Sequence, residues 1–124
     1  MKKVITWNNI PVEVDTEDRL AVINDQGYET ALLYIPGLPM PVQINLTGPH
    51  PVWSWDGNKA APTIAPSILT QLHWGPERKI IRNHVFVRSG QIQYLGDCTH
   101  EYAGTTMDLP RLCEWPEDLR LWEE

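Results

Sequence analysis

Basic residues are scarce in this sequence. Ten Lys and Arg stand against sixteen Asp and Glu, which gives a formal net charge of -6 and a pI near 5.1. Nucleic-acid backbones and anionic membrane surfaces both reward an excess of Lys and Arg, so this composition argues against either partner. The only close group of cations comprises Arg78, Lys79 and Arg82, and it is too small to indicate such a surface.

Long apolar runs are also missing. None approaches the roughly 20 residues needed to span a bilayer, and the N-terminal MKKVITWNNIPVEV lacks the apolar centre and cleavage site of a signal peptide. We therefore expect a cytoplasmic protein. Only two cysteines are present, Cys98 and Cys113, and we expect them to be reduced thiols, with a disulfide between them as the alternative.

Helical periodicity is limited to one C-terminal stretch, whereas eleven prolines and eight glycines punctuate the chain. This pattern predicts one mainly β domain over residues 1–124, a small sheet, sandwich or barrel-like structure with short helical turns. We expect a polar loop over 15–29, with a turn of helix near 17–22, and helical turns over 111–122. The expected strands cover residues 2–7, 10–14, 30–35, 41–46, 68–74, 79–88, 91–97 and 105–109.

A long irregular connection, residues 47–66, is predicted before the strand at 68–74. Loops of this length inside a compact domain are uncommon unless they are functional. Trp53 and Trp55 flank Ser54 in this segment, so both should share one face of a short extended run. They either pack at the edge of the core or form the apolar wall of a cleft for an extended peptide.

The segment RNHVFVRSGQIQYLGD allows a register to be predicted. If Ser89-Gly90 is a two-residue hairpin loop, Arg88 lies opposite Gln91 and His84 opposite Leu95. One face is then apolar and should meet the core. The other face carries both His84 and Asp97, as diagonal neighbours about 7–8 Å apart at the backbone. A register shifted by one residue would place them on opposite faces.

Two interpretations of the His84 and Asp97 pair remain open. The pair is either a simple surface ion pair or a base whose Nδ1 proton is held by the aspartate, leaving Nε2 free to act. Asp97, Cys98 and His100 are also ligand types suited to zinc, and His84 could join them across the hairpin. However, the register sends Cys98 to the core side, where we interpret it as a buried structural thiol, as we do Cys113.

Ser67, in the stretch PTIAPSI, follows a proline and precedes a strand. Such a position can expose a side chain at a strand end, but the residues by themselves favour a simple Pro-Ser turn. Nothing in the sequence matches the G-x-S-x-G nucleophile elbow. Ser67 gains a chemical role only if the fold brings it to His84. His50 and His73 have no evident partners and are interpreted as structural or solvent-facing.

Several ordered motifs over about residues 53–110 resemble a family of small bacterial and phage proteins. They are WSWDGN, PTIAPSI, NHVFVRSGQIQYLGDCTH and AGTTMDLP. Phage members are often labelled "ammonia monooxygenase", and some relatives in bacterial ubiquitination-like (Bub) operons are described as serine-type peptidases acting on a ubiquitin-like protein. The family usually has Cys where this chain has Asn83.

The resemblance implies a serine peptidase without a cofactor, acting on a ubiquitin-like protein or similar extended peptide. Ser67 would be the nucleophile, His84 the base and Asp97 the orienting acid. His100 would support them, and a backbone N–H near Ser67 or Thr63 would meet the oxyanion. Two alternatives stand beside it: a zinc hydrolase using His84, Asp97 and His100, and a non-catalytic phage or defence accessory protein that only binds a ligand.

Overall fold

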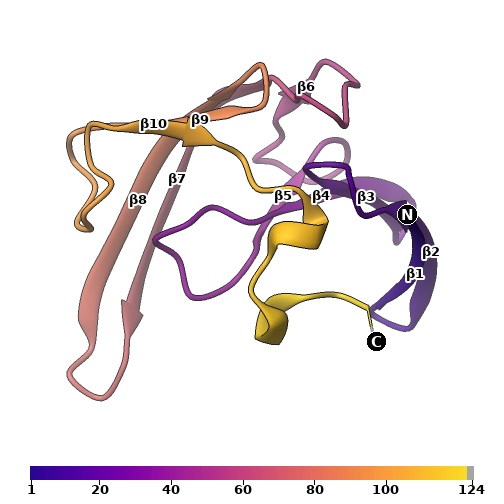
Figure 1. Cartoon of the computed structure of the whole chain (residues 1–124), viewed down its shortest axis with the longest axis horizontal. Coiled ribbons are helices and arrows are strands. Elements are labelled where there is room, and N and C mark those ends of the chain that lie inside the picture. Colours follow the sequence, from indigo (N-terminus) through magenta and orange to yellow (C-terminus); the bar gives the residue numbers. More distant parts are fainter. Residues whose placement is uncertain (123–124) are drawn as a thin grey trace.

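The structure, a computed structural model, describes residues 1–122 and consists mainly of antiparallel β-strands (Figure 1). Among these residues no helix has the length and apolar character needed to cross a membrane. Three sheets form, ordered β1-β2, β3-β4-β5 and β10-β9-β8-β7-β6. The strands are β1 (Lys2–Trp7), β2 (Ile10–Asp15), β3 (Ala21–Asp25), β4 (Tyr28–Leu33), β5 (Val42–Asn45), β6 (Ser54–Trp55), β7 (Ile64–Trp74), β8 (Lys79–Arg88), β9 (Gln91–Tyr94) and β10 (Thr106–Asp108). The prediction of a mainly β fold is confirmed.

Two-residue turns define the N-terminal hairpins. Asn8 and Asn9, both with positive φ, join β1 to β2, the strands expected over 2–7 and 10–14. Gln26 and Gly27 do the same between β3 and β4. The expected loop over 15–29 is confirmed for residues 16–20, which form turns but no turn of helix. It was wrong for residues 21–29, which belong to the β3–β4 hairpin, where Ala21, Ile23 and residues 30–33 are buried. Residues 112–114 and 117–119 form the expected short helical turns, η1 and η2.

The strands β7 and β8 form an arm that extends beyond the rest of the molecule (Figure 1). They pair in register from Ile68 opposite Val85 to Trp74 opposite Lys79. The pairing is irregular between Ile64 and Ile68, where β7 carries a bulge that contains Ser67. β7 thus begins four residues earlier than the expected strand at 68–74. The base of the arm packs on the core, and its tip is exposed.

Two hydrophobic clusters fill the interior. The larger lies between the five-stranded and three-stranded sheets and includes Ile68, Val85, Ile92 and Tyr94. The smaller lies between β1–β2, β3–β4 and the C-terminal segment, and it includes the fully buried Trp115. Because β8 contributes Val85 and Val87 to the larger cluster, its even-numbered residues must face away from the core. This alternation places His84 on the outer face.

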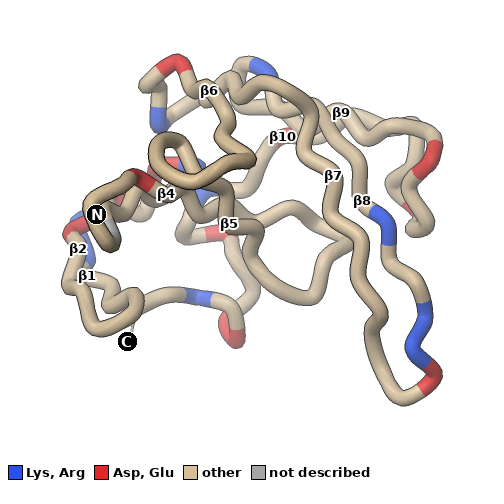
Figure 2. Tube along the Cα trace, turned by 180° about the vertical axis from the view of Figure 1, so that it is seen from behind, with Lys and Arg blue, Asp and Glu red and all other residues tan. Residues whose placement is uncertain are grey.

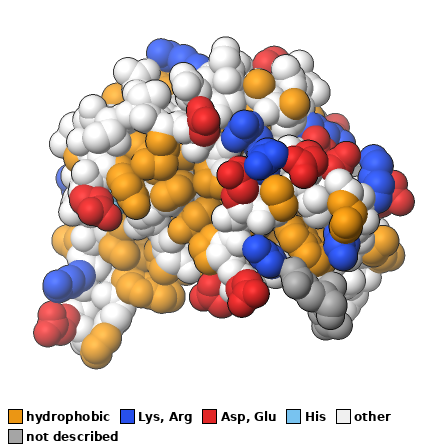
Figure 3. All heavy atoms as spheres, viewed as in Figure 1, with side chains coloured by type: hydrophobic (Ala, Val, Ile, Leu, Met, Phe, Trp, Pro, Cys, Tyr) orange, Lys and Arg blue, Asp and Glu red, His pale blue; other side chains and the backbone are white. Residues whose placement is uncertain are grey.

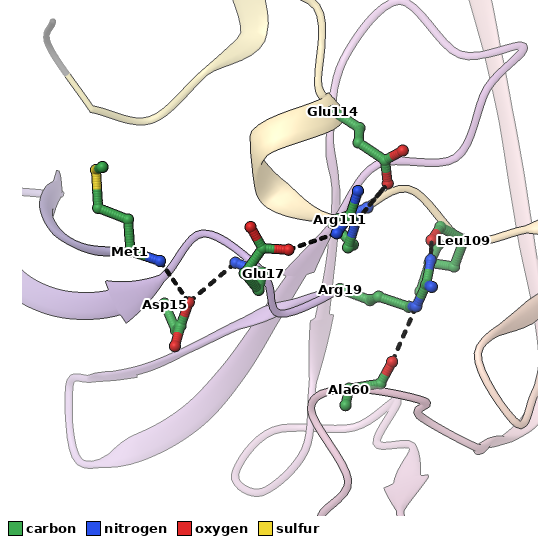
Figure 4. A network of polar contacts seen from close by, with 8 residues as sticks. All are labelled: Met1, Asp15, Glu17, Arg19, Ala60, Leu109, Arg111 and Glu114. Atoms are coloured by element: carbon green, nitrogen blue, oxygen red, sulfur yellow. Dashed lines mark hydrogen bonds and ion pairs between the residues drawn. The ribbon is translucent and has the colours of Figure 1, made fainter.

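Polar contacts fasten the C-terminal segment to the rest of the chain (Figure 4). Arg111 pairs with Glu17 and, at 3.1 Å, with Glu114, and Arg19 donates to the carbonyls of Leu109 and of Ala60 (2.9 Å). These exposed ion pairs contribute little stability individually. These contacts position the segment after β10 against the turn between β2 and β3, residues 16–20.

Candidate active site

The hairpin between β8 and β9 has the predicted register. Ser89 and Gly90 both have positive φ and form the two-residue loop, with Arg88 opposite Gln91 and Phe86 opposite Gln93. The Leu95 N–H donates to the His84 carbonyl at 2.9 Å, which continues the pairing past the end of β9. The register prediction is therefore confirmed, and it leaves His84 and Asp97 on the same side of the sheet.

The structure brings Ser67, His84 and Asp97 into one hydrogen-bonded relay. Ser67 Oγ lies 3.0 Å from His84 Nε2, and His84 Nδ1 lies 3.2 Å from Asp97 Oδ2. With Nδ1–H donating to the carboxylate, Nε2 carries the lone pair and accepts the Ser67 hydroxyl proton. The side chains of His84 and Asp97 are 25% and 49% exposed, so the relay is open to a large molecule.

Asp97 is positioned by residues 95–99, which follow β9 and hydrogen-bond to the edge of β8 on the β9 side. Thr99 N–H donates to the Arg82 carbonyl at 3.0 Å, and Thr99 Oγ1 accepts the Arg82 N–H at 2.9 Å. The Cys98 thiol lies 3.3 Å from the His84 amide nitrogen, and its sulfur is 3.4 Å from the His84 carbonyl oxygen. Cys98 is buried, as predicted, but its contact with the backbone of His84 was not foreseen. Cys98 and Cys113 are both free thiols.

Ser67 is held from the β6 side. The Trp53 indole N–H donates to the Ser67 carbonyl at 3.2 Å, and β6 pairs with β7 just before the bulge. Trp53 and Trp55 both pack, half-buried, against the larger hydrophobic cluster. Trp53 thus anchors the backbone of Ser67 in addition to filling the edge of the core. The tryptophan pair suggested a shared face but gave no sign of this hydrogen bond.

His100 is not brought to the relay. Its Nε2–H donates to Oδ1 of the fully buried Asn83 at 2.7 Å, and its Nδ1 accepts the Tyr102 N–H at 3.2 Å. Its ring also contacts Tyr94, on the core face of the sheet and opposite to His84. Within residues 1–122 no three His, Cys, Asp or Glu side chains are grouped to hold a metal ion. The expected set of His84, Asp97 and His100 is therefore not assembled.

Thr63 lies beside the loop at the end of β8 rather than beside His84. Its Oγ1 accepts the Ser89 N–H at 2.9 Å, and its own N–H donates to Asp56 Oδ1 at 3.2 Å. Its amide is therefore already engaged by a carboxylate. The structure gives Thr63 a part in fixing the hairpin loop and does not place it beside Ser67 Oγ.

We expect stability to depend on pH through His100. Burial lowers the pKa of His100 below its ordinary value of 6.5. Below pH 6.5, His100 is therefore protonated more readily in the unfolded chain than in the folded protein. The free energy of unfolding should then fall as pH drops below about 6.5. His100→Gln, which cannot titrate, should show a shallower fall in urea denaturation between about pH 7 and 5. Equal slopes in the two proteins would contradict this expectation.

A family model described as "Bacterial ubiquitination-like system serine protease (BubE)" matches residues 6–95. This range covers well over half of the chain. The chain belongs to the BubE family. The BubE match contains Ser67 and His84 and ends two residues before Asp97, so the family match alone does not include the third group of the relay. A search of the curated proteins and a search of the solved structures each found no match.

Membership in the BubE family confirms the resemblance seen in the sequence and changes its bounds. The motifs suggested a likeness over about residues 53–110, whereas the match begins at residue 6 and ends at residue 95, before the motif AGTTMDLP. The BubE family is described as a serine protease of a bacterial ubiquitination-like system.

Proposed function

We propose that this BubE-family chain is a serine peptidase that cleaves the extended tail of a ubiquitin-like protein, with Ser67, His84 and Asp97 as its catalytic residues. The relay from Ser67 Oγ through His84 to Asp97, with spacings of 3.0 and 3.2 Å, is the observation that carries the proposal. These are the spacings and the order of contacts that nucleophile, base and orienting acid require. No cofactor takes part.

In the first step Ser67 Oγ attacks the scissile carbonyl carbon as its proton passes to His84 Nε2. Collapse of the tetrahedral intermediate breaks the C–N bond, and the imidazolium returns that proton to the leaving amine. Water then attacks the acyl-enzyme, again giving its proton to Nε2, and Ser67 is regenerated with release of the carboxylic acid. Throughout these steps Asp97 accepts a hydrogen bond from His84 Nδ1–H and stabilises the imidazolium, so His84 keeps the required tautomer.

The openness of the site supports a protein tail as substrate. His84 and Asp97 lie on the outer face of the sheet, and their side chains are partly exposed. Leu69, which is 55% exposed, lies directly opposite His84 on the same face. An extended segment can approach Ser67 along this face with an apolar contact beside the nucleophile. The family description, a serine protease of a ubiquitination-like system, points to a protein substrate.

Labelling with a small alkyl fluorophosphonate tests the nucleophile. We expect one equivalent to attach to the wild-type protein at Ser67, identified by peptide mass spectrometry, because His84 Nε2 lies 3.0 Å from Ser67 Oγ and can take its proton. Ser67→Ala should abolish the labelling. Ser54→Ala is the matched control, since Ser54 Oγ instead bonds the Ala65 carbonyl at 3.2 Å, and it should be labelled like the wild type. Labelling that persists in Ser67→Ala, or a folded wild-type protein that is not labelled, would contradict the proposal.

A further inference from the structure

One edge of the five-stranded sheet lies open next to Ser67. The edge strand β6 has two residues and pairs only with Ala65 and Ile64 of β7. Within residues 1–122, the stretch of β7 from Ile68 to Trp74 pairs with β8 alone. Natural sheets commonly protect such an edge with Lys or Pro, but the residues from Ser67 to Trp74, SILTQLHW, contain neither.

The main-chain groups at this edge can be assigned from the pairing of β8. His84 and Arg82 direct their N–H and C=O groups toward the segment 95–99. Their partners on β7, Leu69 and Gln71, therefore belong to non-hydrogen-bonded pairs, and their N–H and C=O groups point away from β8. The same alternation applies to His73. The Ser67 carbonyl also points outward, because it accepts the Trp53 indole.

A mostly apolar hollow lies on the core side of this edge. It has a volume of about 410 Å³ and extends from Thr70 of β7 to the loop that precedes β5. Its lining includes Trp7, Leu38 and Met40 and contains no charged side chain. Met40 is 42% exposed. Figure 3 shows hydrophobic side chains gathered between the arm and the body of the molecule on the face that it draws.

We propose that β7 binds the extended substrate as an added antiparallel strand, using the outward main-chain groups of Leu69, Gln71 and His73. This inference rests on the proposed function and specifies how the substrate is held. Every pairing within the sheet is antiparallel, and a strand added to an exposed edge is a common way of recognising an extended peptide. The bound segment would run directly past Ser67.

Strand addition also defines the side chains of the peptide. Successive residues of the added strand point to opposite faces. Those on the side of Thr70 enter the uncharged hollow, so they should be apolar. Those on the side of Leu69 lie on the same face of the sheet as His84 and Arg82, so polar or acidic residues suit them. Lys and Arg positions follow the outer half of β8 toward the tip of the arm (Figure 2), which also favours an acidic peptide over a basic one.

Binding can be measured without cleavage in the full-length Ser67→Ala protein. The probe is the capped hexapeptide acetyl-Val-Glu-Val-Thr-Val-Thr-amide, followed by NMR of the protein amides. We expect shift changes and slowed hydrogen exchange at Leu69, Gln71 and His73. In an antiparallel strand the Glu and Thr residues direct their N–H groups toward β7. N-methylation of these residues should weaken binding at least about ten-fold, since each methyl group removes a donor and blocks close approach, whereas N-methylation of the valines should not.

A matched pair of variants tests the edge from the protein side. Gln71→Pro removes an outward N–H without touching the bonds to β8, because Gln71 is not in a hydrogen-bonded pair. In the Ser67→Ala background it should weaken peptide binding about ten-fold or more, while Gln71→Ala, which loses the same side chain, should bind within about two-fold of its parent. Circular dichroism and thermal unfolding verify that both variants are folded.

Equal affinity for the two methylated peptides, or amide changes confined to sites away from β7, would overturn the strand-addition proposal. Concentration-dependent protection of the β7 amides without peptide would overturn it as well, by showing a second copy of the chain at this edge. A small fluorophosphonate can react with Ser67 without binding to the edge of β7. Labelling without peptide binding therefore rejects the added strand alone, and peptide binding without labelling rejects the serine peptidase alone.

Discussion

Replacing His84 by alanine is expected to slow the reaction at Ser67 by about 10⁴- to 10⁶-fold. Without an acceptor at Nε2, 3.0 Å from Ser67 Oγ, the hydroxyl keeps its proton and remains a weak nucleophile. The rate of fluorophosphonate labelling measures the loss directly. Because the side chain of His84 is on the outer face, the free energy of unfolding should change by no more than about 1 kcal/mol.

His73→Ala is the matched control for His84→Ala. His73 belongs to the same arm and the same face as His84, but its Nδ1 contacts only the Arg78 carbonyl, at 3.4 Å. Its removal should leave the labelling rate within about two-fold of the wild type. If His84→Ala and His73→Ala reacted at the same rate, His84 could not be the base.

Asp97→Asn should lower the labelling rate by about 10³- to 10⁴-fold, the second-largest effect. The amide NH₂ would donate to His84 Nδ1, which moves the ring proton to Nε2. A protonated Nε2 faces Ser67 Oγ as a donor and cannot accept the hydroxyl proton. The size of the substituted side chain is unchanged, so the effect reports the tautomer rather than a change in packing.

Asp108→Asn provides the comparison for Asp97→Asn. Asp108 lies at the end of β10 and accepts a hydrogen bond only from the Gln91 side chain, at 3.4 Å. The same chemical change there should leave the rate within about two-fold. A rate for Asp97→Asn within about ten-fold of the wild type would leave the pair as a simple surface ion pair, one of the two interpretations that the sequence allows.

Local chemistry explains which parts of the fold and site could be predicted. The Ser89-Gly90 turn has positive φ at both residues, and the apolar alternation of β8 and β9 admits one register, so the shared face of His84 and Asp97 followed from the sequence. The β3–β4 hairpin was missed because its strands carry polar residues and its turn, Gln26-Gly27, is a weaker signal. The bulge in β7 was missed because bulges leave no reliable pattern.

The sequence by itself determined that this is a mainly β protein, and that a histidine and an aspartate share one face of a hairpin. It could not determine that His100 lies across the sheet from them, because the path of residues 95–100 depends on contacts with β8. It also could not bring Ser67 to His84, since the two meet only through the pairing of β7 with β8 and the bulge between Ile64 and Ile68. A nucleophile and base from different strands require long-range pairing, which only the tertiary structure supplies.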